Sequence, residues 1–279
     1  HPPNQVIGNL NVGVQTRSAT NIQNECHFSV FISMVESKSI KEALEHADWI
    51  IAMQEELAKF DRNEVWTLVP PPQHHHMVGT RWVFRNKLDD AGGISRNKAR
   101  LVAKGFIQIE GLDYDETFSP VARLEAIRIF LPYASHNGFK VYQIDVKSAF
   151  LNGELDTEVY LQKPPGFINL SFPNYGYKLR KAIYGLKQAP RAWYEIRTDF
   201  LKRSGFQRGI LDPTLFRRSN GRHLMLVQIH VDDIIFGSTD SSMVEDFANV
   251  MIKQFQMSMN RELSFFLGLQ VKQTNKGIF

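Results

Sequence analysis

The feature that most constrains this chain is a pair of adjacent aspartates, Asp232 and Asp233, set between two apolar runs. Residues 224–231 and 234–236 are mostly large aliphatic residues, several of them β-branched, which is typical of strands. Two such runs joined at an acidic pair predict a β-hairpin with carboxylates at its tip. No glycine or asparagine stands beside the pair to explain the turn, so the carboxylates need another explanation.

Adjacent carboxylates at the tip of a buried hairpin repel each other and lose solvation, so we expect a cation to neutralise them. Mg²⁺ suits this position, because it prefers oxygen ligands and binds carboxylates together with substrate phosphates. The alternative is a surface hairpin whose turn is acidic by chance. The chain contains an example: Asp89 and Asp90 precede Ala-Gly-Gly among basic residues, which predicts a solvated turn.

A third carboxylate, Asp145, lies in the apolar segment 141–151, where a charge is costly. Only folding can bring it near the Asp232-Asp233 pair, because the two sites are far apart in sequence. A carboxylate on one strand beside an aspartate pair on a neighbouring hairpin would form a two-metal site, with ions roughly 3.5–4 Å apart. A separation beyond about 10 Å would exclude a shared ion and overturn this hypothesis.

Hydrophobic spacing and turn residues predict the other elements. Ser39 and Glu42 form a capping box before the first helix, and Pro132 is expected to kink or end the second. Strands and helices alternate without a βαβ rhythm, which favours an α+β fold over a doubly wound sheet. The predicted helices cover 41–60, 120–131, 190–204 and 241–255, and the predicted strand segments are 78–106, 141–151 and 263–271.

Composition narrows the class of protein. The net charge of +4 conceals two basic segments, 78–110 and 178–208, which flank the acidic segment 111–177. Basic segments suit a polyanion such as nucleic acid, and a solvated charged face is the alternative. The single cysteine, Cys26, excludes an internal disulfide framework and a cysteine zinc cluster, and it fits an intracellular, non-secreted chain. No apolar stretch reaches 18 residues, so no membrane span is predicted.

Four long motifs occur in order along the chain. They are 98–106 (KARLVAKGF), 143–153 (QIDVKSAFLNG), 182–194 (AIYGLKQAPRAWY) and the hairpin segment 231–233 (VDD). With these motifs, residues 40–279 resemble the reverse transcriptase domain of Ty1/copia retrotransposons, most closely those of plants. The resemblance implies an RNA-directed DNA polymerase that adds dNTPs to a primer 3′-OH by two-metal-ion nucleotidyl transfer.

The resemblance also implies a right-hand polymerase fold of the α+β class, with fingers, an antiparallel palm sheet and an incomplete or absent thumb. We expect a piece of a longer polyprotein, because the chain begins with His1 and ends within a hydrophobic run. The expected organisation is a linker or disordered tail at 1–38, a helix and Pro-rich connection at 39–77, fingers at 78–140, palm at 141–155, a fingers return at 156–190, and palm at 191–279.

The resemblance assigns roles residue by residue. Asp145, Asp232 and Asp233 are the expected catalytic and metal-binding residues, with two Mg²⁺ ions for which Mn²⁺ can substitute. Phe150 matches a steric gate that excludes a 2′-OH, with ordinary core packing as the alternative. The expected nucleotide-binding residues are Lys98, Arg100, Phe150 and Gln188, and the expected primer-positioning residues are His230, Phe266, Leu267 and Gly268.

Two residues depart from the family pattern: His230 stands where tyrosine is usual, and Pro132 interrupts a helix. Three adjacent histidines, 74–76, follow a triple proline and predict a solvated loop rather than a metal site. The expected partners are an RNA or DNA template with primer, dNTPs, and the rest of the polyprotein, with integrase upstream and RNase H downstream. No membrane partner is expected, and the location is a cytoplasmic virus-like particle or the nucleus. A catalytically inactive remnant and a nucleic-acid-binding module without chemistry remain alternatives.

Overall fold

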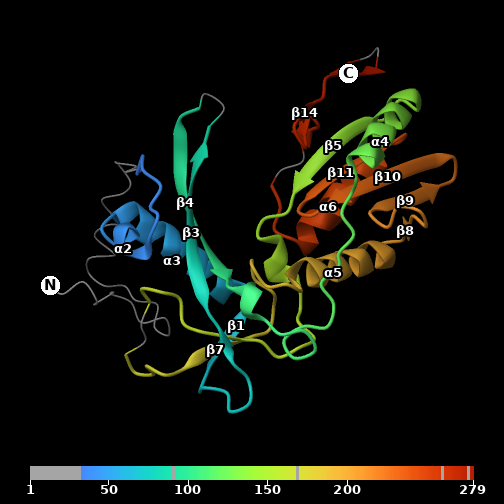
Figure 1. Ribbon diagram of the computed structural model, residues 1–279. Coiled ribbons are helices and arrows are strands. Elements are labelled where there is room, and N and C mark those ends of the chain that lie inside the picture. The colour runs from blue at the N-terminus through green and yellow to red at the C-terminus, as the bar shows by residue number, and fades with distance from the viewer. Residues whose placement is uncertain (1–32, 90–91, 168–169, 259–260, 275–276) are drawn as a thin grey trace. The chain divides into compact units, whose positions relative to one another are not determined.

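The computed structural model describes residues 33–89, 92–167, 170–258, 261–274 and 277–279 (Figure 1). The chain divides into two compact units of mixed helix and strand, each assembled from two separate segments. Unit 1 comprises 1–116 and 154–189, and unit 2 comprises 117–153 and 190–279. Residues 1–32 of the expected linker lie outside the described residues, as do Asp90 and Ala91 of the expected solvated turn.

Unit 1 combines two helices with a small sheet and a long hairpin. The sheet has the strand order β1-β7-β6-β2, and β3 and β4 form a separate antiparallel ribbon (Figure 1). The predicted hairpin over 78–106 is therefore confirmed. The elements are α2 (Ile40–Ala43), α3 (Ala47–Arg62), η1 (Gly105–Ile107), β1 (Trp66–Val69), β2 (Met77–Val78), β3 (Thr80–Leu88), β4 (Ile94–Ala103), β6 (Tyr160–Leu161) and β7 (Gly176–Leu179).

The first predicted helix is two helices. The Ser39 hydroxyl accepts the Glu42 backbone N–H at 3.3 Å, as the capping box predicted. After α2, the N–H groups of Glu45 and His46 bond to carbonyls only three residues back, which tightens the chain before α3 begins. Buried Trp49 of α3 then meets Phe84 of β3 edge-on at 5.1 Å, so α3 packs against the hairpin. The cap was predicted correctly, but the break was missed.

Two motif glycines let distant segments of unit 1 touch through their backbones. A Cβ at Gly105 would lie 2.0 Å from the carbonyl oxygen of Gly185. A Cβ at Gly185, where φ is +92°, would lie 2.2 Å from the carbonyl oxygen of Ala103. No side chain fits at either position. The first and third sequence motifs are thus packed together.

Unit 2 is built on a six-stranded antiparallel sheet with the order β12-β5-β11-β10-β9-β8. The hairpin predicted over 224–236 and the strand pair predicted over 263–271 are both confirmed. The helices are α4 (Leu124–His136), η2 (Ala149–Asn152), α5 (Ala189–Arg203) and α6 (Ser241–Gln254). The strands are β5 (Lys140–Asp145), β8 (Gln207–Arg208), β9 (Leu215–Asn220), β10 (His223–His230), β11 (Asp233–Ser238), β12 (Arg261–Glu262), β13 (Phe265–Phe266), β14 (Leu269–Gln270), β15 (Gln273–Thr274) and β16 (Gly277–Ile278).

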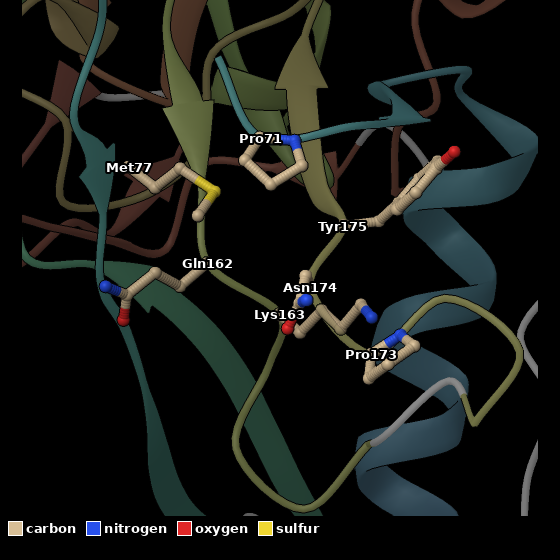
Figure 2. A pocket seen from close by; sticks show the side chains of 7 residues that line it. All are labelled: Pro71, Met77, Gln162, Lys163, Pro173, Asn174 and Tyr175. Carbon is tan, nitrogen blue, oxygen red and sulfur yellow. The ribbon is translucent and has the colours of Figure 1, made fainter. Parts of the chain in front are cut away.

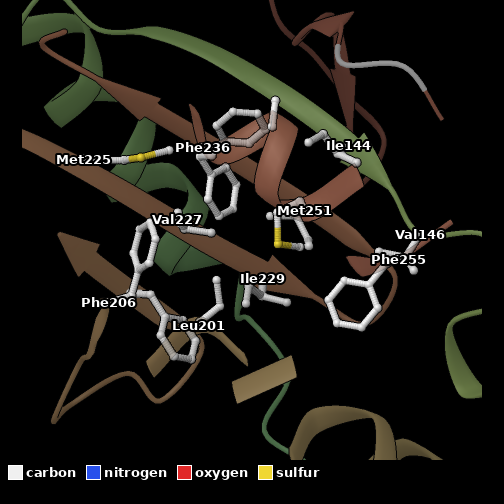
Figure 3. Packing of buried hydrophobic residues seen from close by; sticks show 14 of the residues in the cluster. Ile144, Val146, Leu201, Phe206, Met225, Val227, Ile229, Phe236, Met251 and Phe255 are labelled. Carbon is white, nitrogen blue, oxygen red and sulfur yellow. The ribbon is translucent and has the colours of Figure 1, made fainter. Parts of the chain in front are cut away.

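Both faces of this sheet are covered. Ile144 and Ile234 belong to a cluster with residues of α5 and α6, part of which is drawn in Figure 3. Val141 and Ile235, which lie on the same two strands, belong to a second cluster with residues of α4. Successive side chains of a strand point to opposite faces, so burial on both sides explains why the consecutive residues 234–236 of β11 are all apolar.

Helix α4 differs from its prediction in two ways. It begins at Leu124 rather than at Pro120, and Pro132 does not end it, since it continues to His136. An internal proline costs about 3 kcal/mol. Here its ring lies on the exposed side, while Ile127, Phe130 and Ala134 are buried against the sheet, so packing outweighs the cost. The helix lies in unit 2, although its residues were expected to belong with 78–140.

Candidate active site

The three aspartates singled out in the sequence meet at one end of the unit 2 sheet. Strands β5 and β11 are antiparallel neighbours, and their register pairs Asp145 with Asp233. Such partners have Cα atoms about 4.5–5.5 Å apart. One residue further, the Val146 N–H donates to the Asp232 carbonyl at 3.0 Å. The separation beyond about 10 Å that would have overturned the hypothesis is therefore excluded.

The charge at this end of the sheet is partly buried. Asp233 is half-buried, and its carboxylate accepts a hydrogen bond from the Gln143 amide at 2.9 Å. Burial raises the pKa of Asp233 above its ordinary value and the charge of Asp232 adds to this, while Gln143 and His230 act in the opposite direction. A carboxyl group in this environment is stabilised by a nearby cation.

The donor set suits a hard divalent cation, because it consists of carboxylate oxygens on two adjacent strand ends. Among the described residues, no three His, Cys, Asp or Glu side chains stand close enough together to hold a metal ion as placed. The Asp233 carboxylate is turned to Gln143. The backbones that carry the carboxylates are adjacent.

The turn that carries Asp232 is strained. Its first residue, Val231, has φ +54°, a left-handed conformation that β-branched residues rarely adopt. Two donors from α5 meet at the Val231 carbonyl: the Trp193 indole N–H at 2.8 Å and the Arg197 guanidinium. Sequence reasoning missed both residues, since a tryptophan and an arginine in a helix carry no signal for such a contact.

Positive φ values gather near the predicted site residues. Within the described part of the chain, the non-glycine residues with positive φ are Glu64, Ser148, Val231 and Leu267. Ser148 stands between Asp145 and Phe150, Val231 precedes Asp232, and Leu267 is itself a predicted primer-positioning residue. Strained backbone of this kind tends to cluster at functional sites, which supports the choice of this end of the sheet.

Phe150 lies in η2, five residues after Asp145, and is half-buried. Its ring packs against the cluster shared with α5 and α6, so the structure shows packing for part of the side chain. A Cβ at Gly153 would lie 2.9 Å from the backbone of Ala192 and Trp193, which fixes this segment against α5. The proposed steric gate remains a prediction.

Predicted primer-positioning residues lie close to one another in unit 2. The His230 ring and the buried Phe266 ring meet edge-on with centroids 6.3 Å apart, and His230 Nδ1 lies 3.2 Å from the Ala122 carbonyl oxygen. Leu267 and Gly268, with φ of +48° and +80°, form the turn between β13 and β14. His230 is also the register partner of Asp233, so this cluster adjoins the carboxylates.

The predicted nucleotide-binding cations lie on β4 of unit 1. Strand alternation puts Lys98 and Arg100 on the face opposite the buried Ala99 and Leu101. The Arg100 guanidinium lies 4.9 Å from the centroid of the Tyr184 ring. Burial, with smaller contributions from Arg100 and Lys87, lowers the pKa of Lys98 to about 8. Lys98 is therefore a cation whose charge changes near physiological pH.

Gln188, also in unit 1, has its amide inside a buried network. Its Nε2 donates to the Asp113 carbonyl at 2.8 Å, and its Oε1 accepts from Gln108 at 3.1 Å. Asp113 and Gln188 are 2% and 7% exposed. The structure thus gives Gln188 a supporting role within unit 1, and its contact with a nucleotide remains a prediction.

Other features of unit 1 carry no comparable chemistry. The predicted histidine loop places the His75 ring 5.4 Å from Tyr160, and His76 Nε2 lies 3.5 Å from the Asp113 carboxylate. One surface pocket has a single charged group, Lys163, and no carboxylate, histidine or cysteine (Figure 2). It is lined by Pro71, Met77, Gln162, Lys163, Pro173, Asn174 and Tyr175.

Among the described helices, none has the length and apolar character needed to cross a membrane.

The family of the chain follows from comparison with known proteins. The family model described as reverse transcriptase (RNA-dependent DNA polymerase) matches residues 63–279, which include all three aspartates. The chain belongs to this reverse transcriptase family. The resemblance drawn from the four motifs is thereby confirmed.

Three relatives of this reverse transcriptase domain are copia-type Pol polyproteins of plants. The retrovirus-related Pol polyprotein from transposon RE1 of Arabidopsis thaliana is 40% identical over 255 residues, which is 90% of this chain and 17% of that polyprotein. The corresponding polyprotein from transposon RE2 is 42% identical, over 87% of this chain and 17% of that polyprotein. The Pol polyprotein from transposon TNT 1-94 of Nicotiana tabacum is 35% identical, over 85% of this chain and 18% of that polyprotein. The chain thus spans about a sixth of these relatives.

Proposed function

We propose that the chain is the RNA-directed DNA polymerase core of a copia-type retrotransposon polyprotein, with unit 2 as its palm and unit 1 as its fingers. It adds dNTPs to a primer 3′-OH and releases pyrophosphate. The observation that carries the proposal is the pairing of Asp145 with Asp233 beside Asp232 in a chain of the reverse transcriptase family.

The carboxylates supply the ligands for two magnesium ions, which manganese can replace. Asp145 and Asp232 would hold the ions, and Asp233, whose carboxylate accepts a hydrogen bond from Gln143, would support them. When bound, the ions would lower the pKa of the primer hydroxyl and neutralise charge on the leaving pyrophosphate. The protein keeps the carboxylates on adjacent strands, so little backbone motion is needed to assemble the site.

Cations and aromatic groups account for substrate binding in this proposal. Lys98 and Arg100 bind the triphosphate of the incoming nucleotide, and Phe150 excludes ribonucleotides. The basic segments 78–110 and 178–208 bind the template-primer backbone, so binding is salt-sensitive and largely independent of sequence. The rest of the polyprotein, including integrase and RNase H, is the expected covalent context.

Primer extension tests the proposal directly. The chain is incubated with an RNA template annealed to a DNA primer, dNTPs and Mg²⁺ or Mn²⁺, beside an Asp145→Asn variant. Extension by the wild type alone supports polymerase function. Template-primer binding that both proteins share, without extension by either, contradicts it and favours a nucleic-acid-binding module without chemistry.

The inactive-remnant alternative depends on His230. Its ring is the cross-strand neighbour of Asp233 and contacts Phe266, at the position where the family usually has tyrosine. A His230→Tyr variant that extends primers when the wild type does not would identify His230 as the defect. Failure of both proteins, with intact folding by circular dichroism, would favour an inactive remnant.

A further inference from the structure

A buried arginine lies behind the turn that carries Asp232. Arg197 is 2% exposed and, within the described part of the chain, has no hydrogen bond or ion pair to a carboxylate. Burial lowers its pKa to about 9, and the charge of nearby Asp232 acts in the opposite direction. Its guanidinium donates to the Val231 carbonyl and lies 5.4 and 5.7 Å from the ring centroids of Trp193 and Tyr194. Its Nε has no hydrogen-bond partner among the described residues. A charge buried with so little compensation is costly, so its place calls for an explanation beyond stability.

Trp193 converges on the same atom. It lies one helical turn before Arg197 on α5, and its indole N–H donates to the Val231 carbonyl at 2.8 Å. Trp193 is itself 1% exposed and is held edge-on against Phe255 at 5.2 Å. Two rigidly packed donors on one helix face therefore fix a single carbonyl oxygen in space.

That carbonyl belongs to the strained residue of the turn. Val231 has φ +54°, which a β-branched residue keeps only when its surroundings over-determine the backbone. Val231 precedes Asp232, so the orientation of its peptide sets where the Asp232 carboxylate leaves the chain. The carbonyl of Asp232 is fixed on the other side by the Val146 N–H.

We propose that Trp193 and Arg197 are positioning residues for Asp232: their joint hydrogen bonds to the Val231 carbonyl hold the turn so that the carboxylate faces Asp145. The inference rests on the proposed function, because Asp232 is the metal ligand that it places. The two side chains act through the turn and touch neither the metal ions nor the nucleotide.

The test uses substitutions that keep packing and remove donors. Trp193→Phe retains an aromatic ring, and Arg197→Met fills the space of the stem without a charge. Tyr194→Phe is the matched control, since it also removes a hydroxyl from α5, and that hydroxyl donates to the Pro213 carbonyl and accepts from Arg208 rather than bonding to Val231. Mn²⁺ binding is measured by loss of the free-ion EPR signal, primer extension by kcat and KM for dNTP, and stability by thermal melting.

We expect Trp193→Phe and Arg197→Met each to weaken Mn²⁺ binding and lower kcat by about tenfold, with the KM for dNTP unchanged. Arg197→Met should melt at the same temperature as the wild type or higher, because it removes a buried charge. If Arg197 served stability alone, Arg197→Met would melt at a lower temperature and keep the Mn²⁺ affinity and kcat of the wild type. Tyr194→Phe should bind Mn²⁺ as the wild type does.

The outcomes separate this inference from the proposed function. Wild-type extension with unchanged Mn²⁺ affinity and kcat in both variants overturns the inference alone. Wild-type Mn²⁺ binding that both variants weaken, without primer extension, supports the inference and counts against polymerase function. A wild-type chain that binds no Mn²⁺ overturns both.

Discussion

This molecule has two acidic hairpin tips, at the ends of β3–β4 and β10–β11, and their turns are stabilised in different ways. At the first tip, exposed Asp89 accepts the Gly93 N–H at 2.8 Å, and Gly92 takes the positive φ of +83°. At the second, a valine takes the positive φ, and buried donors from α5 hold its carbonyl. The described hydrogen bonds of the first turn join its own residues, whereas the carbonyl of the second turn is held by side chains of α5.

This difference explains why similar sequences carry different chemistry. A turn stabilised by glycine and a local side chain can keep its shape without contacts from the rest of the fold. A turn held by a helix has a fixed orientation, and fixed orientation is what a shared metal ion requires of its ligands. The strain at Val231 thus accompanies the proposed site, in line with the general association of strained backbone with function.

The largest expected effect comes from removing one charge at each tip. Asp232→Asn should reduce primer extension by at least about a hundredfold, because it removes a proposed metal ligand and its transition-state stabilisation. Asp89→Asn, the matched change at the other tip, should leave the rate within about twofold, since Asp89 is exposed and belongs to unit 1 rather than to the carboxylate cluster of unit 2. Single-turnover extension rates measure both. Equal losses in the two variants would remove the functional distinction between the tips.

Substituting the residue with positive φ in each turn compares the two tips by their effect on the free energy of unfolding. Gly92→Ala should lower the free energy of unfolding by about 1 kcal/mol, because alanine is strained at φ +83° although it meets no neighbouring atom. Val231→Gly should change it by less than about 1 kcal/mol, since relief of strain offsets the added freedom of the unfolded chain. Urea denaturation measures both values. A large loss in Val231→Gly would show that its side chain, rather than the turn, matters most.

The smallest expected effect concerns the cation on the first hairpin. With a pKa of about 8, Lys98 loses its charge as the pH rises from 7 to 9. The KM for dNTP should therefore rise by about twofold to fivefold over this interval, the range expected for a partly exposed ion pair. Lys98→Arg should flatten the profile, because guanidinium stays charged. Parallel profiles in the two proteins would remove Lys98 from triphosphate binding.

The same group affects folding with a defined sign. The pKa of Lys98 in the folded chain is about 8, whereas an unfolded lysine has a pKa near about 10.4, so between these values the unfolded state binds more protons. Its contribution to stability is therefore unfavourable below pH 8 and recovers as the pH rises towards 10.4. Denaturation midpoints of the wild type and Lys98→Met, compared at pH 7 and 10, measure this contribution.

Much of the fold could be predicted from local patterns. The apolar alternation around the β10–β11 turn, the capping box at Ser39 and the turn residues of β3–β4 gave their elements correctly, because each signal lies within a few residues. Helix boundaries were less accurate. The break between α2 and α3 and the continuation of α4 through Pro132 both depend on which side chains find a buried surface, and local spacing does not contain that information.

The sequence by itself determined the family, the acidic turn and the residue types able to bind a divalent ion, since these depend on composition and order along the chain. Tertiary structure alone decided that Asp145 stands opposite Asp233, that Gln188 lies in a buried network, and that α5 holds the Val231 turn. Such contacts join residues far apart in the chain. They exist only when burial and hydrogen bonding across the whole unit offset the entropy of bringing those segments together.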